Sequence, residues 1–171
     1  MQNVEVKAAL AGNEQVPRRL PDLGFTRQRR LLEQTDRYFQ VPRGRLKLRQ
    51  HKGDRHAELI FYVRSTRNTP RASDFQRLTV DDPAHLLRLL RGMFTPGVCV
   101  RKKRELWLRD DVRVHVDDVA GLGRFLEIEV PVRTGRTAAA ARRVMAALVR
   151  ELDITRTSML ADSYADLLAR R

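Results

Sequence analysis

The sequence predicts an α+β fold in which a closed or nearly closed antiparallel β-barrel carries a few helices on its outside. Seven or eight segments with the two-residue alternation of strands follow one another, joined by short polar or glycine-containing turns. Segments with the helical spacing of apolar residues stand between and after these strands. Because no repeat or linker divides the 171 residues, we expect one domain over residues 1–171.

The expected strands begin near the N-terminus, where residues 3–10 have the sequence NVEVKAAL. Residues 36–50 predict a strand, a turn at residues 42–44 and a second strand, which is the pattern of a hairpin. The remaining expected strands cover residues 57–65, 73–80, 98–109, 111–119 and 124–133. Together they supply enough strands to curl a sheet into a barrel.

Helices are expected at three or four places. Asp82 and Pro83 are typical of a helix start, and this helix is expected to stop near Pro96. From Thr137 onward, apolar residues recur at helical spacing, so this second helix covers an apolar surface. Residues 158–170 predict a terminal helix of the same kind. The segment 14–30 is ambiguous, since two prolines interrupt it.

Charge narrows the range of partners. The chain has 34 Lys and Arg against 21 Asp and Glu, a net charge of +13, which favours polyanionic partners such as nucleotides, polyphosphate or nucleic acid. Aromatic residues make up only 6% and form no clustered stacking motif, which argues against nucleic acid. With a single cysteine and no apolar run long enough for a membrane span, we expect a cytoplasmic protein without disulfides or membrane contact.

Charged residues share one face of five expected strands, because residues two apart in a strand point the same way. Valine, leucine and isoleucine occupy the opposite faces, which predicts that those faces form the core. The carboxylates on the polar faces are Glu5, Asp117, Glu127 and Glu129. The cations on the polar faces are Lys7, Lys47, Arg49, Lys102, Arg104 and Arg113. For any one strand, a solvent-exposed exterior is the alternative to a charged lumen.

A barrel that closes with its polar faces inward would have a charged lumen. Three or four carboxylates suit a hard divalent cation such as Mg²⁺ or Mn²⁺. Five or six Lys and Arg side chains can neutralise a triphosphate. The pattern therefore favours metal-assisted phosphoryl or nucleotidyl chemistry, in which positioning and charge stabilisation provide most of the rate.

Several sequence blocks resemble those of the CYTH family, the triphosphate tunnel metalloenzymes that include class IV adenylyl cyclases, thiamine triphosphatases and inorganic tripolyphosphatases. The opening NVEVK is similar to the family's E-x-E-x-K signature. Further blocks follow in the expected order: GRLKLR, KKREL, VHVDDVAGLGRFLEIEV and SYADLL. In its overall sequence pattern the chain is more similar to the bacterial cyclase-like members than to the thiamine triphosphatases.

The resemblance implies an eight-stranded antiparallel tunnel with a charged lumen that holds a triphosphate and a divalent cation, Mg²⁺ or Mn²⁺. The implied metal ligands are Glu5, Asp117 and Glu127, with Glu129 supporting or joining them. The implied phosphate contacts are Lys7, Lys47, Arg49, Lys102 and Arg104, with Arg64 and Arg113 as further candidates. The implied catalytic residues are Lys7, Arg104 and Glu127. Asn3 stands where the signature has its first glutamate, which would weaken a second metal site.

The function that the resemblance implies is that of a class IV adenylyl cyclase-like enzyme, which converts ATP to cyclic AMP and pyrophosphate. One alternative is a triphosphatase that hydrolyses inorganic tripolyphosphate or thiamine triphosphate, since it would use the same charged lining. A second alternative is a non-catalytic binder of nucleotide or polyphosphate. The expected partner is thus a small triphosphate, and the sequence leaves a homodimer open.

Overall fold

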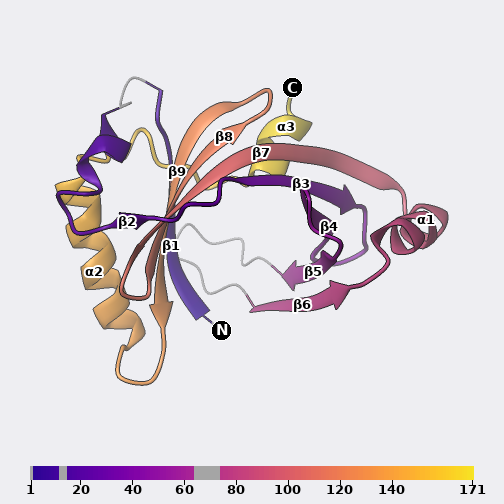
Figure 1. Ribbon diagram of the computed structural model, residues 1–171, viewed down its shortest axis with the longest axis horizontal. Helices are drawn as coiled ribbons and strands as arrows, with labels where there is room; N and C mark the ends of the chain where they lie inside the picture. Colours follow the sequence, from indigo (N-terminus) through magenta and orange to yellow (C-terminus); the bar gives the residue numbers. More distant parts are fainter. Residues whose placement is uncertain (1, 12–14, 64–73) are drawn as a thin grey trace.

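The computed structural model describes residues 2–11, 15–63 and 74–171, and its main feature is a curled antiparallel sheet (Figure 1). Eight strands follow one another in the order β1-β9-β8-β7-β3-β4-β5-β6, and β2 pairs with β7 beside this path. The strands are β1 Gln2–Ala9, β2 Thr26–Arg27, β3 Leu32–Phe39, β4 Arg45–His51, β5 Ala57–Val63, β6 Asp74–Val80, β7 Pro96–Arg109, β8 Val112–Val119 and β9 Gly123–Val132. The helices are η1 Val16–Arg19, a 3₁₀ turn, and α1 Pro83–Met93, α2 Ala138–Glu151 and α3 Tyr164–Ala169.

The sheet joins two runs of sequential strands through one long-range pairing. Neighbours along the chain pair in β3-β4-β5-β6 and in β7-β8-β9, and the pairing of β3 with β7 connects the two runs. Strand β1 returns to pair with β9, so β1 and β6 form the two ends of the strand order. Among the described residues, no pairing joins β1 to β6, so the sheet is a curled half-barrel. The predicted fold class is confirmed.

The outer face of the sheet carries the hydrophobic core and thereby fixes which residues point inward. Val114 of β8 and Ile128 of β9 are fully buried in one cluster with Leu148 of α2, which packs on this side of β1 and β9 (Figure 1). A second outer cluster joins Leu48 of β4 to Leu90 of α1. Since adjacent strand residues point to opposite faces, the charged residues between these apolar ones point to the inner face.

Two of the three predicted helices begin where capping residues predict. The side chain of Asp82 accepts a hydrogen bond from the His85 amide at 2.9 Å at the start of α1, and Thr137 caps α2 in the same way. The described part of the ambiguous segment 14–30, from residue 15 onward, contains η1 and the short strand β2. No helix in the described ranges is long and apolar enough to cross a membrane.

The predicted terminal helix over residues 158–170 was wrong at its start, because α3 begins only at Tyr164. The preceding residues pair with β1 instead: the Ala9 amide donates to the Ser158 carbonyl, and the Leu160 amide donates to the Lys7 carbonyl, each at 2.8 Å. Helix α3 then begins at a capping box between Ser163 and Asp166. Backbone hydrogen bonds to β1 thus outweigh local helix propensity here.

A stability prediction concerns Gly44 in the turn before β4. Its φ of +74° is strained for other residues, and an added Cβ would lie 2.8 Å from the Tyr62 carbonyl oxygen and 2.9 Å from the Phe61 ring. We expect Gly44→Ala to lower the free energy of unfolding by about 1–3 kcal/mol in urea denaturation. Gly53→Ala is the matched control, because Gly53 has a φ of +85° with nothing within 4 Å of the added Cβ. Equal losses in both variants would contradict a role for the close approach of this turn to β5.

Candidate functional site

A cavity of about 420 Å³ lies on the inner face of the curled sheet, and strands β1, β4, β7, β8 and β9 bring charged residues of predicted function to it. Strand β6 contributes one further cation, Arg77, and the end of the chain contributes Ser163 and Tyr164. The charged and ionisable residues of the lining are Glu5, Lys7, Asp36, Lys47, Arg49, Arg77, Lys102, Arg104, Arg113, His115, Glu127 and Glu129. The cavity is therefore an ionic chamber with an apolar shell outside it.

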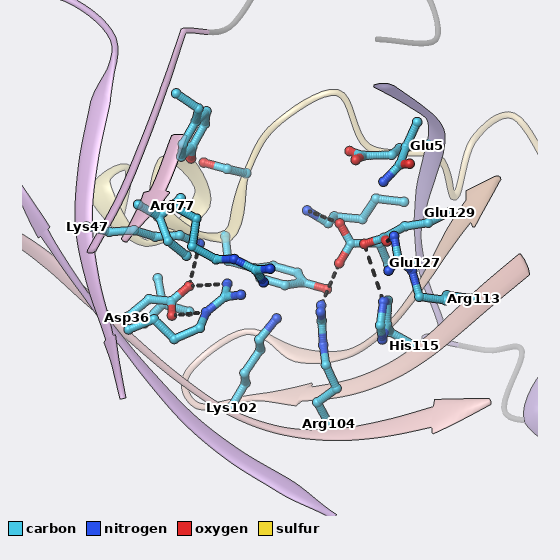
Figure 2. Close-up of a pocket in the computed structure, with 18 of the residues that line it drawn as sticks. Glu5, Asp36, Lys47, Arg77, Lys102, Arg104, Arg113, His115, Glu127 and Glu129 are labelled. Atoms are coloured by element: carbon cyan, nitrogen blue, oxygen red, sulfur yellow. Dashed lines mark hydrogen bonds and ion pairs between the residues drawn. The ribbon is translucent and has the colours of Figure 1, made fainter. Parts of the chain in front are cut away.

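Three carboxylates gather on the β1 and β9 side of the cavity (Figure 2). Glu5 lies directly opposite Glu129 in the pairing of β1 with β9, and Glu127 lies two residues along β9 on the same face. Directly opposite residues of antiparallel strands have Cβ atoms about 4.5–5.5 Å apart. The strand register thus places three carboxylates within reach of one another.

Cations hold two of these carboxylates in their ionised form. Glu127 accepts a hydrogen bond from Arg104 at 2.6 Å, and the Lys7 ammonium lies 3.7 Å from it. Burial alone would raise the pKa of Glu127, but the charges of Lys7 and Arg104 outweigh burial and hold that pKa well below its usual value. Glu129 has Arg113 at 2.9 Å and the His115 Nε2 at 3.3 Å.

Asp117 of β8 lies beneath the cavity and is fully buried. Arg104 donates to both of its oxygens at 2.6 Å, Lys102 donates at 3.1 Å and the Tyr164 hydroxyl donates at 2.9 Å. Burial alone would raise the pKa of Asp117, but the charges of Arg104 and Lys102 outweigh burial. The pKa therefore lies below its usual value, and the carboxylate stays ionised. These donors fix Asp117 as the anchor that orients Arg104 and Lys102.

The opposite wall, on β3 and β4, is built around Asp36, a buried carboxylate that the sequence analysis left out of the site. It accepts from Lys47 at 2.6 Å and from Arg49 at 2.8 and 2.9 Å. Burial lowers the pKa of Lys47 to about 8 despite this carboxylate. Burial and the neighbouring Arg104 lower the pKa of Lys102 to about 7. Figure 2 shows Asp36 and Lys47 facing the glutamates across the cavity.

Helix α3 lies over one end of the cavity and brings Tyr164 into it. The Lys7 ammonium lies 4.2 Å and the Lys102 ammonium 5.3 Å from the centre of the Tyr164 ring. Arg45 of β4 holds the helix in place through hydrogen bonds to Ser163, at 2.8 Å, and to Asp166. This C-terminal segment is thus part of the site and not only a cover over the barrel.

The structure brings most of the predicted site residues into this one cavity. Those that line it are Glu5, Lys7, Lys47, Arg49, Lys102, Arg104, Arg113, Glu127 and Glu129. Asp117 supports the cavity from below, and Arg64 lies outside the described residues. Asn3 also lines the cavity. The roles assigned to these residues, as metal ligands, phosphate contacts or catalytic groups, stay predictions.

The carboxylates have the chemistry that a divalent metal requires, although Glu127 and Glu129 form ion pairs with cations in the structure. Glu5, Glu127 and Glu129 offer the hard oxygen ligands that Mg²⁺ and Mn²⁺ prefer. Within residues 2–11, 15–63 and 74–171, no three His, Cys, Asp or Glu side chains converge as closely as metal ligands do. Glu127 and Glu129 would therefore have to turn from their ion pairs to share a cation.

Several residues that the sequence does not predict for the site also line the cavity. Most of them can be found only from the fold. Asp36, Tyr38, Tyr62 and Arg77 lie on β3, β5 and β6 and reach the site through strand pairing. His115 lies two residues before Asp117 on β8, on the same face of the strand. The sequence signal that could have found Asp36 is its two-residue spacing from Tyr38 within a predicted strand.

The sequence matches the model of the CYTH domain over residues 1–164. It is 23% identical over 180 residues to a protein of Methanocaldococcus jannaschii named "Putative adenylate cyclase MJ0240", with 98% of each chain covered. Among solved structures, it is similar to the PH1012 protein of Pyrococcus horikoshii OT3, with a TM-score of 0.86, 21% identity, and coverage of 98% of this chain and 99% of that one. A Vibrio parahaemolyticus structure titled "putative adenylate cyclase" has a TM-score of 0.77 at 16% identity, covering 99% and 98% of the two chains. These structural similarities show a shared fold.

Proposed function

Because the chain belongs to the CYTH domain family, we propose that it is a divalent-metal-dependent enzyme that acts on a triphosphate and converts ATP to cyclic AMP and pyrophosphate. Members of the family act as adenylate cyclases or triphosphatases and generally use divalent metals. The observation that carries the proposal is the cavity itself, in which Glu5, Glu127 and Glu129 face a cationic wall. The name of the Methanocaldococcus jannaschii relative supports the choice of a cyclase.

The triphosphate would lie along the cations of β4 and β7. Lys47, Arg49, Lys102 and Arg104 now neutralise Asp36 and Asp117, and their remaining donors face the cavity. Arg binds phosphate oxygens through its planar fork, whereas Lys acts as a point charge. Lys7 and Arg113 would complete the phosphate contacts from the β1 and β8 side.

Glu5, Glu127 and Glu129 would hold Mg²⁺ or Mn²⁺, which supplies charge neutralisation to the phosphates and orients them for displacement. Glu129 is the ligand that His115 and Arg113 orient, and Glu127 is oriented by Arg104 and Lys7. Asp117 could join the ligands only by turning from its four hydrogen bonds, three of which it accepts from cations.

In the reaction proposed, the 3′-hydroxyl of the ribose loses its proton to water as its oxygen attacks the α-phosphorus. The bond from the α-phosphorus to the oxygen that bridges it to the β-phosphorus breaks, and pyrophosphate leaves. The charge that develops on the phosphoryl oxygens lies beside Arg104 and Lys7, which are fixed before substrate arrives by Asp117 and Glu127. Such preorganised donors stabilise the transition state without reorganisation.

A cytoplasmic location and a homodimer stay predictions from the sequence alone.

One assay set tests this function. Purified protein receives ATP, thiamine triphosphate or tripolyphosphate with Mg²⁺, Mn²⁺ or EDTA, and cyclic AMP, pyrophosphate and orthophosphate are measured. The expected result is cyclic AMP and pyrophosphate in equal amounts from ATP, only with metal present. Orthophosphate release in place of cyclic AMP would make the protein a triphosphatase. Tight metal-independent binding without turnover of any of the three would contradict an enzyme.

The pH dependence of binding follows from Lys47, whose pKa is lowered to about 8. The side chain is cationic below that pKa and neutral above it, so the affinity for tripolyphosphate should fall as pH rises from 7 to 9. In Lys47→Arg the side chain stays charged over this range, and the fall should be smaller. Calorimetric titrations of both proteins at the two pH values measure the difference. Equal falls in the two proteins would rule out Lys47 as the titrating phosphate contact.

A further inference from the structure

We propose that the outer face of the sheet carries a second anion-binding site, separate from the cavity, for a small molecule that bears a phosphate monoester. The site is a groove over β4, β3, β7 and β8. The cations that would hold the phosphate are Arg37, Arg101 and Lys103. These side chains alternate with residues that face the cavity and so point away from it, which makes the proposal independent of the triphosphate function proposed above.

Most of the positive charge of the chain lies outside the cavity. Together with Asp117, the cavity holds seven of the 34 Lys and Arg residues and five of the 21 Asp and Glu residues. Eleven of the thirteen net positive charges are therefore located elsewhere. An excess of this size raises the local concentration of anions at the outer surface.

A groove of about 690 Å³ lies on the outer face of the sheet. Figure 1 shows its strands β3 and β7 running between α2 at one end of the sheet and α1 at the other. Thr35 of β3 lies opposite Gln50 of β4 on one side and opposite Arg101 of β7 on the other. Ala120, just after β8, donates through its amide to the Arg101 carbonyl at 2.9 Å. The short side chains of Thr35 and Ala120 leave a hollow floor between longer ones.

Three cations stand around this floor on two strands. Arg101 lies directly opposite Thr35, a position in which Cβ atoms are about 4.5–5.5 Å apart. Arg37 lies two residues beyond Thr35 on β3, and Lys103 lies two residues beyond Arg101 on β7, each about 6–7 Å along its strand. Because β3 and β7 are antiparallel, Arg37 and Lys103 stand on opposite sides of the Thr35 and Arg101 pair. A phosphate group above that pair would be within reach of all three cations.

Two of the three acids that line the groove are already paired. Glu33 lies 3.2 Å from the ammonium of Lys52, and Arg30 forms an ion pair with Asp54. These four side chains neutralise one another and take no part in holding the anion. The third acid is Asp118, which is exposed.

The three proposed contacts keep a surplus of positive charge. Arg37 donates to the amide oxygen of Gln50 at 2.6 Å, a bond that leaves the charge of Arg37 uncompensated. Arg101 and Lys103 are exposed. Asp118, directly opposite Lys103 in the pairing of β7 with β8, offsets one of the three cations. Two positive charges therefore remain for a ligand.

A phosphate monoester fits both this surplus and this shape. Such a group carries about −1.5 to −2 charges at pH 7, whereas a triphosphate would need more cations than the groove offers. Arginine binds phosphate oxygens through its fork, and the Gln50 amide and the Thr35 hydroxyl can donate as well. The volume leaves room for a small molecule attached to the phosphate. No Phe, Tyr or Trp is among the described residues that line the groove, which argues against stacked nucleic-acid bases.

Arginine side-chain NMR on the full chain tests the proposal, because each Nε–H signal reports on its own surroundings. The signals of Arg37 and Arg101 are assigned by their loss in Arg37→Gln and Arg101→Gln. The signals of Arg49 and Arg104, assigned in the same way, report on the cavity. The probe is glycerol 3-phosphate, with orthophosphate as the comparison. We expect saturable shifts of the Arg37 and Arg101 signals, with weaker binding of orthophosphate.

Two substitutions that remove the same charge separate the groove from a general effect of charge. Lys103→Gln should raise the glycerol 3-phosphate concentration that half-saturates the Arg101 signal at least about tenfold, because it removes one of three charged contacts. Arg91→Gln, exposed on α1, is the matched control and should leave that concentration unchanged. Thermal melts monitored by circular dichroism should show both variants folded.

Three results would overturn the proposal or a part of it. Arg37 and Arg101 signals that do not saturate, or that weaken equally in Lys103→Gln and Arg91→Gln, would rule out the site. Shifts confined to Arg49 and Arg104 would place the phosphate in the cavity alone, and the outer site would again be wrong. Equal affinities for orthophosphate and glycerol 3-phosphate would overturn the choice of a monoester.

Discussion

Glu127→Gln is expected to lower metal-dependent turnover by at least about a hundredfold, the scale of losing one preorganised electrostatic contact in an active site. Glu127 lies at the centre of the site, 2.6 Å from Arg104 and within 3.7 Å of Lys7. The amide keeps the shape of the side chain but carries no charge, so it neither binds a hard cation well nor neutralises these two cations. Turnover of ATP at saturating Mn²⁺ measures the effect.

The matched control is Glu33→Gln on β3, whose side chain pairs with Lys52 on the outer face. It makes the same chemical change outside the cavity and should leave turnover as in the wild type. Circular dichroism should show both variants folded. Full turnover in Glu127→Gln would refute its assignment as a metal ligand, whereas equal losses in both variants would point to a general effect of charge.

Arg104→Met is expected to cost about 3–5 kcal/mol of unfolding free energy, the range for removing one partner of a buried ion pair. Arg104 is 7% exposed and donates to Asp117 and Glu127. Without it, the fully buried Asp117 would keep only Lys102 and Tyr164 as donors. Urea denaturation measures the loss.

Two further variants make the test of this prediction more specific. Arg101→Met, on the same strand but exposed on the outer face, should change stability by no more than about 0.5 kcal/mol. The double variant Arg104→Met with Asp117→Asn should recover much of the loss, because the buried negative charge is then gone. A small loss in Arg104→Met, or a double variant no more stable than it, would contradict the role of Asp117 as the anchor of Arg104.

The sequence predicts which strand residues point into the cavity because apolar and charged residues alternate along the strands. In β8 and β9, valine, leucine and isoleucine alternate with charged residues, and the apolar side is buried under α2. A slip of one residue would exchange the two faces, so the pattern defines which residues point inward. This logic found the cavity positions of Lys102, Arg104 and Glu127.

The part of the site that sequence reasoning missed depends on contacts between distant segments. Asp36 lies opposite Val100 only because β3 pairs with β7, sixty or so residues away. The start of α3 depends on residues 158–160 pairing with β1 and on the Ser163 capping box. Neither pairing leaves a periodic signal in the sequence.

The most direct test of the account is a crystal structure of the protein with Mn²⁺ and a non-hydrolysable ATP analogue, in which anomalous scattering locates the metal. The account predicts a manganese peak at about 2.0–2.2 Å from carboxylate oxygens of the glutamates on β1 and β9, among them Glu127. It also predicts phosphate oxygens against Lys102 and Arg104, on the metal's other side. A manganese peak outside the cavity, or an analogue bound on the outer face of the sheet, would contradict it.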